Sequence, residues 1–226
     1  FLEMGLGKTT STLTALSDLI SDGTVRKVII VAPLRVANSV WEQEAVKWEH
    51  LKHLTFSNLT GDLKDRISCL HKKTNFYIIN KDKLSWLIEY CIEMKKWPFD
   101  TLVVDESSAF KSAQSQMFKS IKKILKHLSR TILLTGTPSP NGMLDLWPQI
   151  YILDQGERLG KFQYMYKERY FQPLDYKGFK WGLKKGHDEL IYEKLKDICL
   201  SMKTIDHIEL PERSVENIQI EADETF

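Results

Sequence analysis

The sequence predicts an α/β fold: a mostly parallel sheet with helices on both faces, plus a small basic and aromatic insertion near the C-terminal end. The first observation is that the expected strands are short, β-branched and apolar at successive positions, as in Lys27–Ala32 and Thr101–Val104. Strands of this kind are buried on both faces. The second is that helical patterns alternate with them, and parallel neighbours need such crossover helices.

The first elements follow from local signals. Residues 1–2 are expected to end a strand. The helix expected over residues 8–20 carries apolar residues at helical spacing until Asp22–Gly23 ends it. The strand over residues 27–32 is closed by Pro33, which has no backbone N–H to continue a ladder.

The next helix is expected to begin at Asn38, a favourable capping residue. Trp41 and Trp48 are seven residues apart on it and should both face the core. The remaining strands are expected over residues 53–58, 76–79, 101–104 and 131–134. The remaining helices are expected over residues 62–72, 83–96, 115–128, 144–153 and 189–202.

One domain is expected over residues 1–205, with an insertion over residues 156–186 in which aromatic and basic residues interleave. Asp175–Gly178 suggests a hairpin turn inside it. Residues 206–226 are acidic and are expected to form an extended exit segment. Because the chain opens at Phe1, inside a motif, we expect a fragment of a longer protein.

Composition argues against several classes of protein. The 32 basic and 30 acidic residues leave a net charge of +2, so overall charge does not indicate a nucleic-acid binder. The longest apolar run, Val28–Leu34, is far shorter than the roughly 20 residues of a membrane helix, and no secretory leader is expected. Three widely spaced cysteines fit a reducing compartment, which predicts a cytoplasmic protein without a disulfide framework.

A glycine-rich segment, Gly5-Leu6-Gly7-Lys8-Thr9, lies between a strand end and a helix start. Its glycines let backbone N–H groups turn inward around an anion, and the helix N-terminus adds its positive dipole end. Lys8 would reach the β- and γ-phosphates of a nucleotide, and the Thr9 hydroxyl would bind Mg²⁺. The alternative is a glycine turn that merely starts a helix.

Two carboxylates, Asp105 and Glu106, follow the apolar strand Leu102–Val104. The carboxyl edge of an open α/β sheet is where ligands bind. Hydrolysis of a phosphoanhydride needs an anchor for Mg²⁺ and a group that orients and deprotonates water. Asp105 suits the anchor and Glu106 the base, whereas an isolated acidic pair at a strand end would simply face solvent.

These residues resemble, in order, motifs I, Ia, II and III of helicase superfamily two: Leu2–Thr9, Val31–Pro33, Asp105–Glu106, and Leu134–Pro138 with Asn141. Motif I is similar to that of the Swi/Snf-type DNA translocase ATPases, and the Asp-Glu-Ser-Ser form of motif II is similar to that of their short bacteriophage and bacterial members. The resemblance implies a RecA-like P-loop lobe over residues 1–205, with a truncated N-terminal strand, in the cytoplasm of a bacterial or phage-infected cell.

The resemblance implies ATP and Mg²⁺ as cofactors, with Thr9 and Asp105 as metal residues and Glu106 and Lys8 as catalytic residues. The residues it implies for nucleotide binding are Glu3, Met4, Gly5, Leu6, Gly7, Lys8, Thr9 and Thr10. Those it implies for DNA contact are Pro33, Arg35, Thr135, Gly136, Thr137 and Asn141. At Ser107–Ser108 the sequence departs from the Asp-Glu-Ala-His form, whose His often links motif II to motif III; a serine hydroxyl has a shorter reach.

The resemblance also implies a second lobe that supplies arginine fingers and closes the ATP cleft. No candidate motif for it follows Glu212, so this chain alone should bind nucleotide weakly and hydrolyse it poorly. The expected partners of the longer protein are that missing lobe and duplex DNA of any sequence, with no membrane.

Two basic clusters are further candidates for DNA contact. Lys119, Lys122, Lys123 and Lys126 share one helix face, and this face could equally be solvated. Seven basic residues lie among the aromatic residues of the segment 161–185. These aromatic side chains could stack on bases, or they could be the core of a small insertion.

Three interpretations of function remain. The leading one is the first lobe of an ATP-driven translocase on duplex DNA. An RNA helicase lobe is the second, and Thr135-Gly136-Thr137 in place of Ser-Ala-Thr speaks against it. The third is a nucleotide-sensing scaffold module without turnover, which intact Lys8, Asp105 and Glu106 disfavour for the whole protein.

Overall fold

The computed structural model describes residues 1–3, 5–110, 112–137, 139, 142–177, 180–203 and 206. Within them the chain forms a five-stranded sheet in which every pairing is parallel, as the sequence predicts. The strands, in spatial order, are β2 (Phe56–Asn58), β3 (Phe76–Asn80), β1 (Val28–Ala32), β4 (Thr101–Asp105) and β5 (Arg130–Leu134). Because β1 lies between β3 and β4, the strand order reverses there, and ligands of open α/β sheets bind at such a point.

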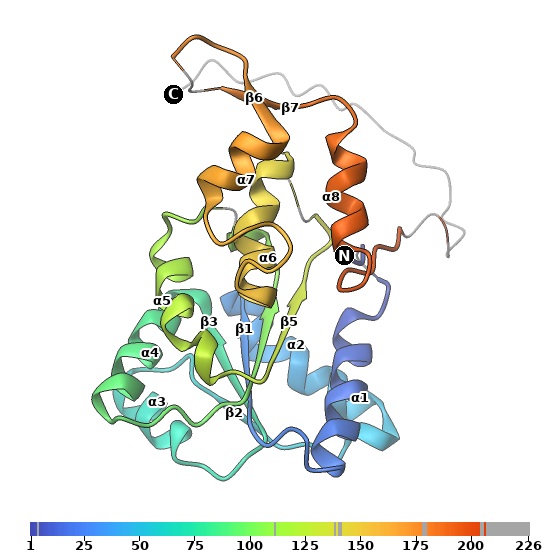
Figure 1. Ribbon diagram of the computed structural model, residues 1–226. Coiled ribbons are helices and arrows are strands. Elements are labelled where there is room, and N and C mark those ends of the chain that lie inside the picture. Colours follow the sequence, from blue (N-terminus) through green and yellow to red (C-terminus); the bar gives the residue numbers. More distant parts are fainter. Residues whose placement is uncertain are drawn as a thin grey trace, which may run out of the picture.

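Helices cover both faces of the sheet (Figure 1). One face packs against α1 (Lys8–Ser21) and α2 (Leu34–Lys47). The other packs against α3 (Leu63–Leu70), α4 (Leu84–Glu93), α5 (Gln116–Ile124) and α6 (Leu146–Asp154). No helix among the described residues is long and apolar enough to cross a membrane.

Side chains of the central strand alternate between two hydrophobic cores. Ile29 and Val31 of β1 pack with α4, α5 and α6. Val28, Ile30 and Ala32 pack with α1 and α2. All of β1 is buried, which explains why its sequence is apolar at every position instead of alternating with polar residues.

Helix α2 begins earlier than expected, so the prediction of Asn38 as its cap is wrong. Pro33 ends β1 and also occupies the N-cap, and its carbonyl accepts the first helical bond, from the Ala37 N–H (2.8 Å). Asn38 lies inside the helix. Trp41 is fully buried as predicted, but Trp48 is 45% exposed, because the backbone is already extended there and leaves the helical register.

The expected insertion, residues 156–186, contains α7 (Gln163–Tyr170) and the antiparallel pair β6 (Phe171–Pro173) and β7 (Trp181–Leu183), at one end of the molecule (Figure 1). It ends at Gly186, the N-cap of α8 (His187–Leu195). The pairing confirms a hairpin, although Gly178 lies outside the described residues. Tyr166, Tyr170 and Phe171 are buried in the main core beside α6 and α8. These three are therefore core residues, but of the main core and not of a separate core inside the insertion, whereas Phe162, Tyr164 and Tyr176 are exposed.

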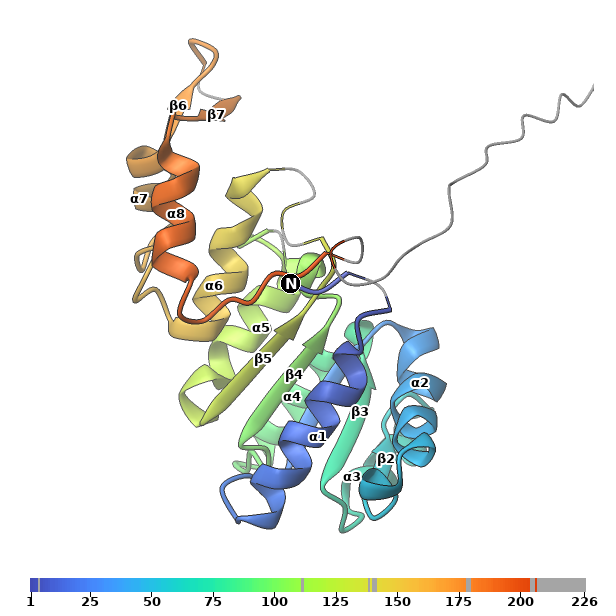
Figure 2. The ribbon, with the colours of Figure 1, turned by 90° about the vertical axis from the view of Figure 1, so that its right-hand side faces the viewer.

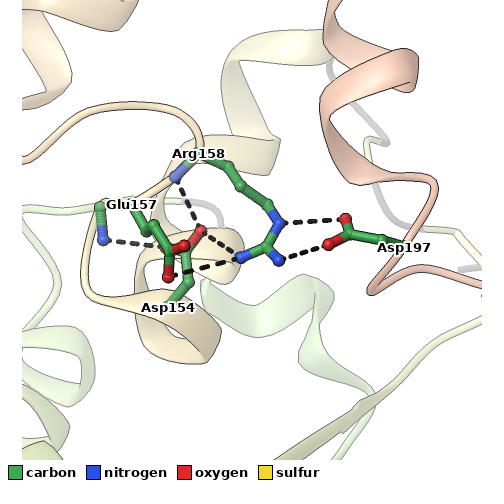
Figure 3. A network of polar contacts seen from close by, with 5 residues as sticks. Asp154, Glu157, Arg158 and Asp197 are labelled. Carbon is green, nitrogen blue, oxygen red and sulfur yellow. Dashed lines mark hydrogen bonds and ion pairs between the residues drawn. The ribbon is translucent and has the colours of Figure 1, made fainter.

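Arg158 connects the end of α6 to the turn after α8 (Figure 3). Its guanidinium donates twice to the Asp197 carboxylate, from Nε (3.1 Å) and Nη2 (2.6 Å), and Nη1 lies 3.4 Å from an Asp154 oxygen. These bonds raise the pKa of Arg158 and lower that of Asp197. Paired carboxylates on both sides of one planar guanidinium fix the distance between the two helices.

Helix α8 ends before residue 202, which corrects the expected span, and residues 200–202 run beside the N-terminus (Figure 2). The Met202 N–H donates to the Phe1 carbonyl (2.9 Å), and the Leu2 N–H donates to the Thr135 carbonyl (3.0 Å). The backbone of Leu2 also forms a parallel bridge with Met202. Residues 1–2 are therefore extended and paired, as expected for the end of a strand.

Candidate nucleotide site

The phosphate loop is the glycine-rich segment Gly5–Thr9, and the strand end that leads into it meets the end of β5 at the carboxyl edge of the sheet. The Leu2 N–H binds the carbonyl of Thr135, directly after β5. A Cβ atom at Gly136 would lie 3.4 Å from the Leu2 carbonyl oxygen, so the two backbones approach closely. The motifs around Lys8 and Thr135 are thus neighbours in space, although more than a hundred residues separate them in the chain.

The glycine segment turns as its sequence predicts. Gly5 has φ +84° and Gly7 has φ +70°, backbone conformations that residues with a Cβ atom rarely adopt. Helix α1 begins directly afterwards at Lys8, and its first turn contains no acidic residue. The positive end of the helix dipole is therefore free to attract an anion. Met4, also predicted to bind nucleotide, lies outside the described residues.

The Lys8 ammonium lies over the backbone of its own loop. Nζ donates to the carbonyl of Leu2 (2.7 Å) and to that of Glu3 (3.2 Å). An ammonium has three N–H donors, so one remains for a phosphate oxygen. This geometry holds the cation beside the glycine turn, where the sequence predicts the phosphates.

Thr9 and Thr10 have different surroundings. The Thr9 hydroxyl has no hydrogen-bond partner among the described residues, so it is available to a metal ion. The Thr10 hydroxyl donates to Glu44 Oε1 on α2 (2.8 Å). Glu44 also accepts from Lys47 and Trp48, and these bonds, that of Lys47 foremost, lower its pKa to about 2. Thr10 therefore connects the phosphate helix to α2.

We expect Glu44→Gln to lower the melting temperature at pH 7, because it removes the charge that accepts these bonds. The Glu44 pKa is about 2 in the folded chain against 4.5 for the ordinary group. The contribution of the Glu44 charge to the free energy of unfolding is therefore complete above pH 4.5 and is lost as the pH falls toward 2. Melting curves between pH 7 and pH 3 should show that the difference in melting temperature between wild type and variant becomes smaller as the pH falls. Glu42→Gln, on the same helix, is the control; a gap that stays constant with pH would contradict the assignment.

Asp105 ends β4 with its carboxylate already oriented. Oδ1 accepts the Glu106 N–H (3.1 Å), and Oδ2 accepts Trp41 Nε1 (3.2 Å) from α2. Burial raises the pKa of Asp105, while the Trp41 bond and the charge of Lys8 act in the opposite direction. A nearby cation stabilises the charged form of a largely buried carboxylate. Each oxygen of Asp105 also keeps a free lone pair, so Asp105 fits the predicted role of metal anchor. No group of three or more His, Cys, Asp or Glu side chains able to hold a metal occurs in the described part of the chain.

Glu106 has a left-handed backbone, with φ +55°. Such a conformation costs a non-glycine residue about 1 kcal/mol or more and is found preferentially at functional sites. The carboxylate oxygen Oε2 lies 3.5 Å from Thr135 Oγ1, a long hydrogen bond. Thr135 Oγ1 in turn accepts the Thr137 N–H (3.1 Å). The acidic motif therefore contacts the Thr-Gly-Thr segment through Glu106 itself.

The serine after this pair points elsewhere. Ser107 is fully buried and donates to Gln149 Oε1 on α6 (2.9 Å). Gln149 Nε2 donates to the Asp145 carbonyl (3.0 Å), so the amide is held in place. Ser107 thus links the acidic motif to α6 and makes no hydrogen bond with the described Thr-Gly-Thr segment. The link that a His often provides is supplied here by Glu106 and Thr135.

Lys81, which sequence analysis missed, is a second cation at this edge. It follows β3 and its Nζ donates to the Glu106 carbonyl (2.9 Å). Burial lowers its pKa, and the charges of Glu106 and Asp105 partly offset this effect. The available signal was a lysine directly after a buried strand. Trp41 and Gln149 gave no such signal, since they look like ordinary core residues.

The predicted DNA-contact residues lie along the same edge, as far as they are described. Pro33 starts α2, and Arg35 is exposed in its first turn. Arg35 makes no ion pair with any described residue, so its guanidinium is not held in a salt bridge within the described part of the chain. Asn141 lies outside the described residues. Lys122, from the basic face of α5, lies over the Tyr151 ring (5.0 Å to its centroid), so at least this lysine contacts the protein itself.

Comparisons with known proteins agree with this geometry. The family described as "SNF2-related domain" matches residues 1–224. Protein p41 of Acyrthosiphon pisum secondary endosymbiont phage 1 is 37% identical over 97% of this chain and 50% of its own length. The chromatin-remodeling ATPase INO80 of Neurospora crassa is 28% identical over 67% of this chain and 8% of its own length.

A solved structure is also similar: the Sulfolobus solfataricus SWI2/SNF2 ATPase core in complex with double-stranded DNA. It superposes with a TM-score of 0.68 at 25% identity, over 90% of this chain and 40% of the other. This chain therefore spans half or less of the length of each of these relatives.

Proposed function

The chain belongs to the family of SNF2-related domains, and we propose that it is the ATP-binding lobe of an ATP-driven translocase on duplex DNA. Its fold is the RecA-like fold of the SWI2/SNF2 ATPase core, and ATPases of this family are ATP-dependent hydrolases. One observation carries the proposal: Thr135 contacts both halves of the site. Its carbonyl accepts the N–H of Leu2, in the strand end that leads into the phosphate loop, and its hydroxyl contacts Glu106.

The residues divide the chemistry of hydrolysis between them. The loop N–H groups and Lys8 would bind the β- and γ-phosphates. Thr9 and Asp105 would hold Mg²⁺, which neutralises charge on the phosphate oxygens when it is bound. Glu106 would orient a water molecule in line with the γ-phosphorus and accept its proton as the phosphoanhydride bond breaks. A change at Glu106 would reach the Thr135–Thr137 segment through the hydroxyl of Thr135.

Duplex DNA is the proposed track. The structural relative is described in complex with double-stranded DNA. Pro33, Arg35 and Thr135–Thr137 lie at the edge that carries the nucleotide site and would contact the phosphate backbone, which gives binding at any sequence. We further propose that residues 1–205 act with a second lobe, joined through residues 206–226, in the cytoplasm of a bacterial or phage-infected cell.

The proposal is tested by ATP hydrolysis of the full-length protein with different nucleic acids. We expect duplex DNA to stimulate turnover several-fold more than duplex RNA or single strands. Stimulation by RNA alone would favour an RNA helicase lobe instead. Tight Mg·ATP binding without turnover under any condition would favour a nucleotide-sensing module.

We expect Arg35→Ala to weaken duplex binding about equally for all sequences, because one phosphate contact is lost. The slope of log affinity against log salt concentration should become smaller in magnitude by roughly one. The measurement is duplex affinity at several salt concentrations, with a melting curve for each variant. Arg26→Ala is the matched control, since Arg26 is an exposed arginine just before β1, at the opposite edge of the sheet. An unchanged slope with a lowered melting temperature would remove Arg35 from the DNA site.

A further inference from the structure

Lys81 lies beside the proposed base, and the proposed steps of hydrolysis give it no role. It begins the short 3₁₀ turn Lys81–Lys83 after β3, whereas Glu106 follows β4, and β1 lies between these two strands. The lysine side chain therefore crosses the end of the central strand to reach the Glu106 carbonyl at 2.9 Å. It is half-buried there, so its ammonium gives up part of its hydration for this contact.

The bond holds the residue with the unusual backbone. Glu106 has φ +55°. This left-handed turn points its carbonyl in a direction different from that of the carbonyls in the preceding strand. A strained backbone persists only when its surroundings fix it. Three contacts do so: its N–H donates to Asp105, its carbonyl accepts from Lys81, and its carboxylate contacts Thr135. Of these, the Lys81 contact alone comes from an element outside the predicted motifs.

We propose that Lys81 is a positioning residue for hydrolysis, which fixes the Glu106 backbone so that its carboxylate is directed at the attacking water. This inference rests on the proposed role of Glu106 as the base. In this role Lys81 acts on the Glu106 backbone and not on the nucleotide or the attacking water. Its loss should therefore slow the chemical step and leave nucleotide and duplex binding almost unchanged, since a small displacement of a catalytic group costs rate more than affinity.

The test is steady-state ATP hydrolysis by the full-length protein at saturating duplex DNA. The variants are Lys81→Met, Lys81→Gln, Glu106→Gln and the double variant Lys81→Met/Glu106→Gln. Lys83→Met is the matched control, because Lys83 lies on the same turn and makes no hydrogen bond or ion pair with a described residue. Melting curves, KM for ATP and duplex affinity are measured for each variant, and single-turnover hydrolysis is used for the slow ones.

We expect Lys81→Met to lower kcat roughly 10- to 100-fold with KM and duplex affinity within about twofold of wild type. Lys81→Gln, which keeps an N–H donor, should recover part of the loss and serves as the test if the methionine variant does not fold. The double variant should be no slower than Glu106→Gln alone, because Lys81 acts through Glu106.

Three results would overturn the proposal. These are an unchanged kcat in Lys81→Met, a loss explained by weaker ATP or duplex binding, and a double variant about tenfold slower than Glu106→Gln. The last would mean that Lys81 acts independently of Glu106. Failure of the proposed function itself is read separately, from wild type and Glu106→Gln: equal turnover of these two would remove Glu106 as the base and Lys81 with it.

Discussion

In the full-length protein, Glu106→Gln should reduce ATP hydrolysis by roughly a hundredfold or more while Mg·ATP still binds. Glutamine keeps the size of the side chain and an oxygen that can accept from Thr135, so the contact at 3.5 Å can persist. What is lost is the carboxylate that takes the proton from water. The measurement is turnover at saturating ATP and duplex DNA, together with nucleotide affinity by titration calorimetry.

Glu89→Gln is the control for removing one negative charge, since Glu89 is exposed on α4. A melting curve establishes that the Glu106 variant is folded, and its left-handed backbone makes this check necessary. Turnover equal to that of wild type would show that Glu106 is not the base. A fall in affinity that accounts for the whole loss would instead assign Glu106 to nucleotide binding.

The parts of the site that sequence analysis could place are those fixed by local rules. Glycines at positions 5 and 7 predict a turn that only a residue without Cβ adopts easily, and both have positive φ. An apolar strand that ends in Asp105–Glu106 predicts carboxylates at a sheet edge, because parallel strands carry their carboxyl ends to the same side. Thr135 directly follows the next strand, β5, so it lies at that edge as well, and its carbonyl accepts the Leu2 N–H.

The parts that could not be predicted depend on contacts between distant segments. Lys81 reaches Glu106 across the end of another strand, and Trp41 binds Asp105 from a helix on one face of the sheet. Both follow from the order of strands in space, which local patterns do not encode. Thr10 looks like a nucleotide residue in sequence, yet its hydroxyl is bound by Glu44 of α2.

The errors in element boundaries have the same origin. Asn38 is a good helix cap by propensity, but Pro33 both closes β1 and starts α2, so the helix had already begun. Residues 200–202 have helical character in sequence but run extended, because they pair with Phe1 and Leu2. In each case a tertiary contact satisfies the backbone and outweighs a local preference.

For the phosphate loop, we expect Lys8→Ala to weaken Mg·ATP binding by the full-length protein roughly a hundredfold, the size of losing charge-assisted hydrogen bonds to phosphate. Nζ also binds the carbonyls of Leu2 and Glu3, so the variant should melt at a lower temperature. Titration calorimetry with ATP and with AMP separates the two effects. Lys8 should contribute to ATP affinity and little to AMP, which lacks the β- and γ-phosphates, whereas a collapsed loop would weaken both. Equal ATP affinity in variant and wild type would contradict the assignment of Lys8 to the nucleotide.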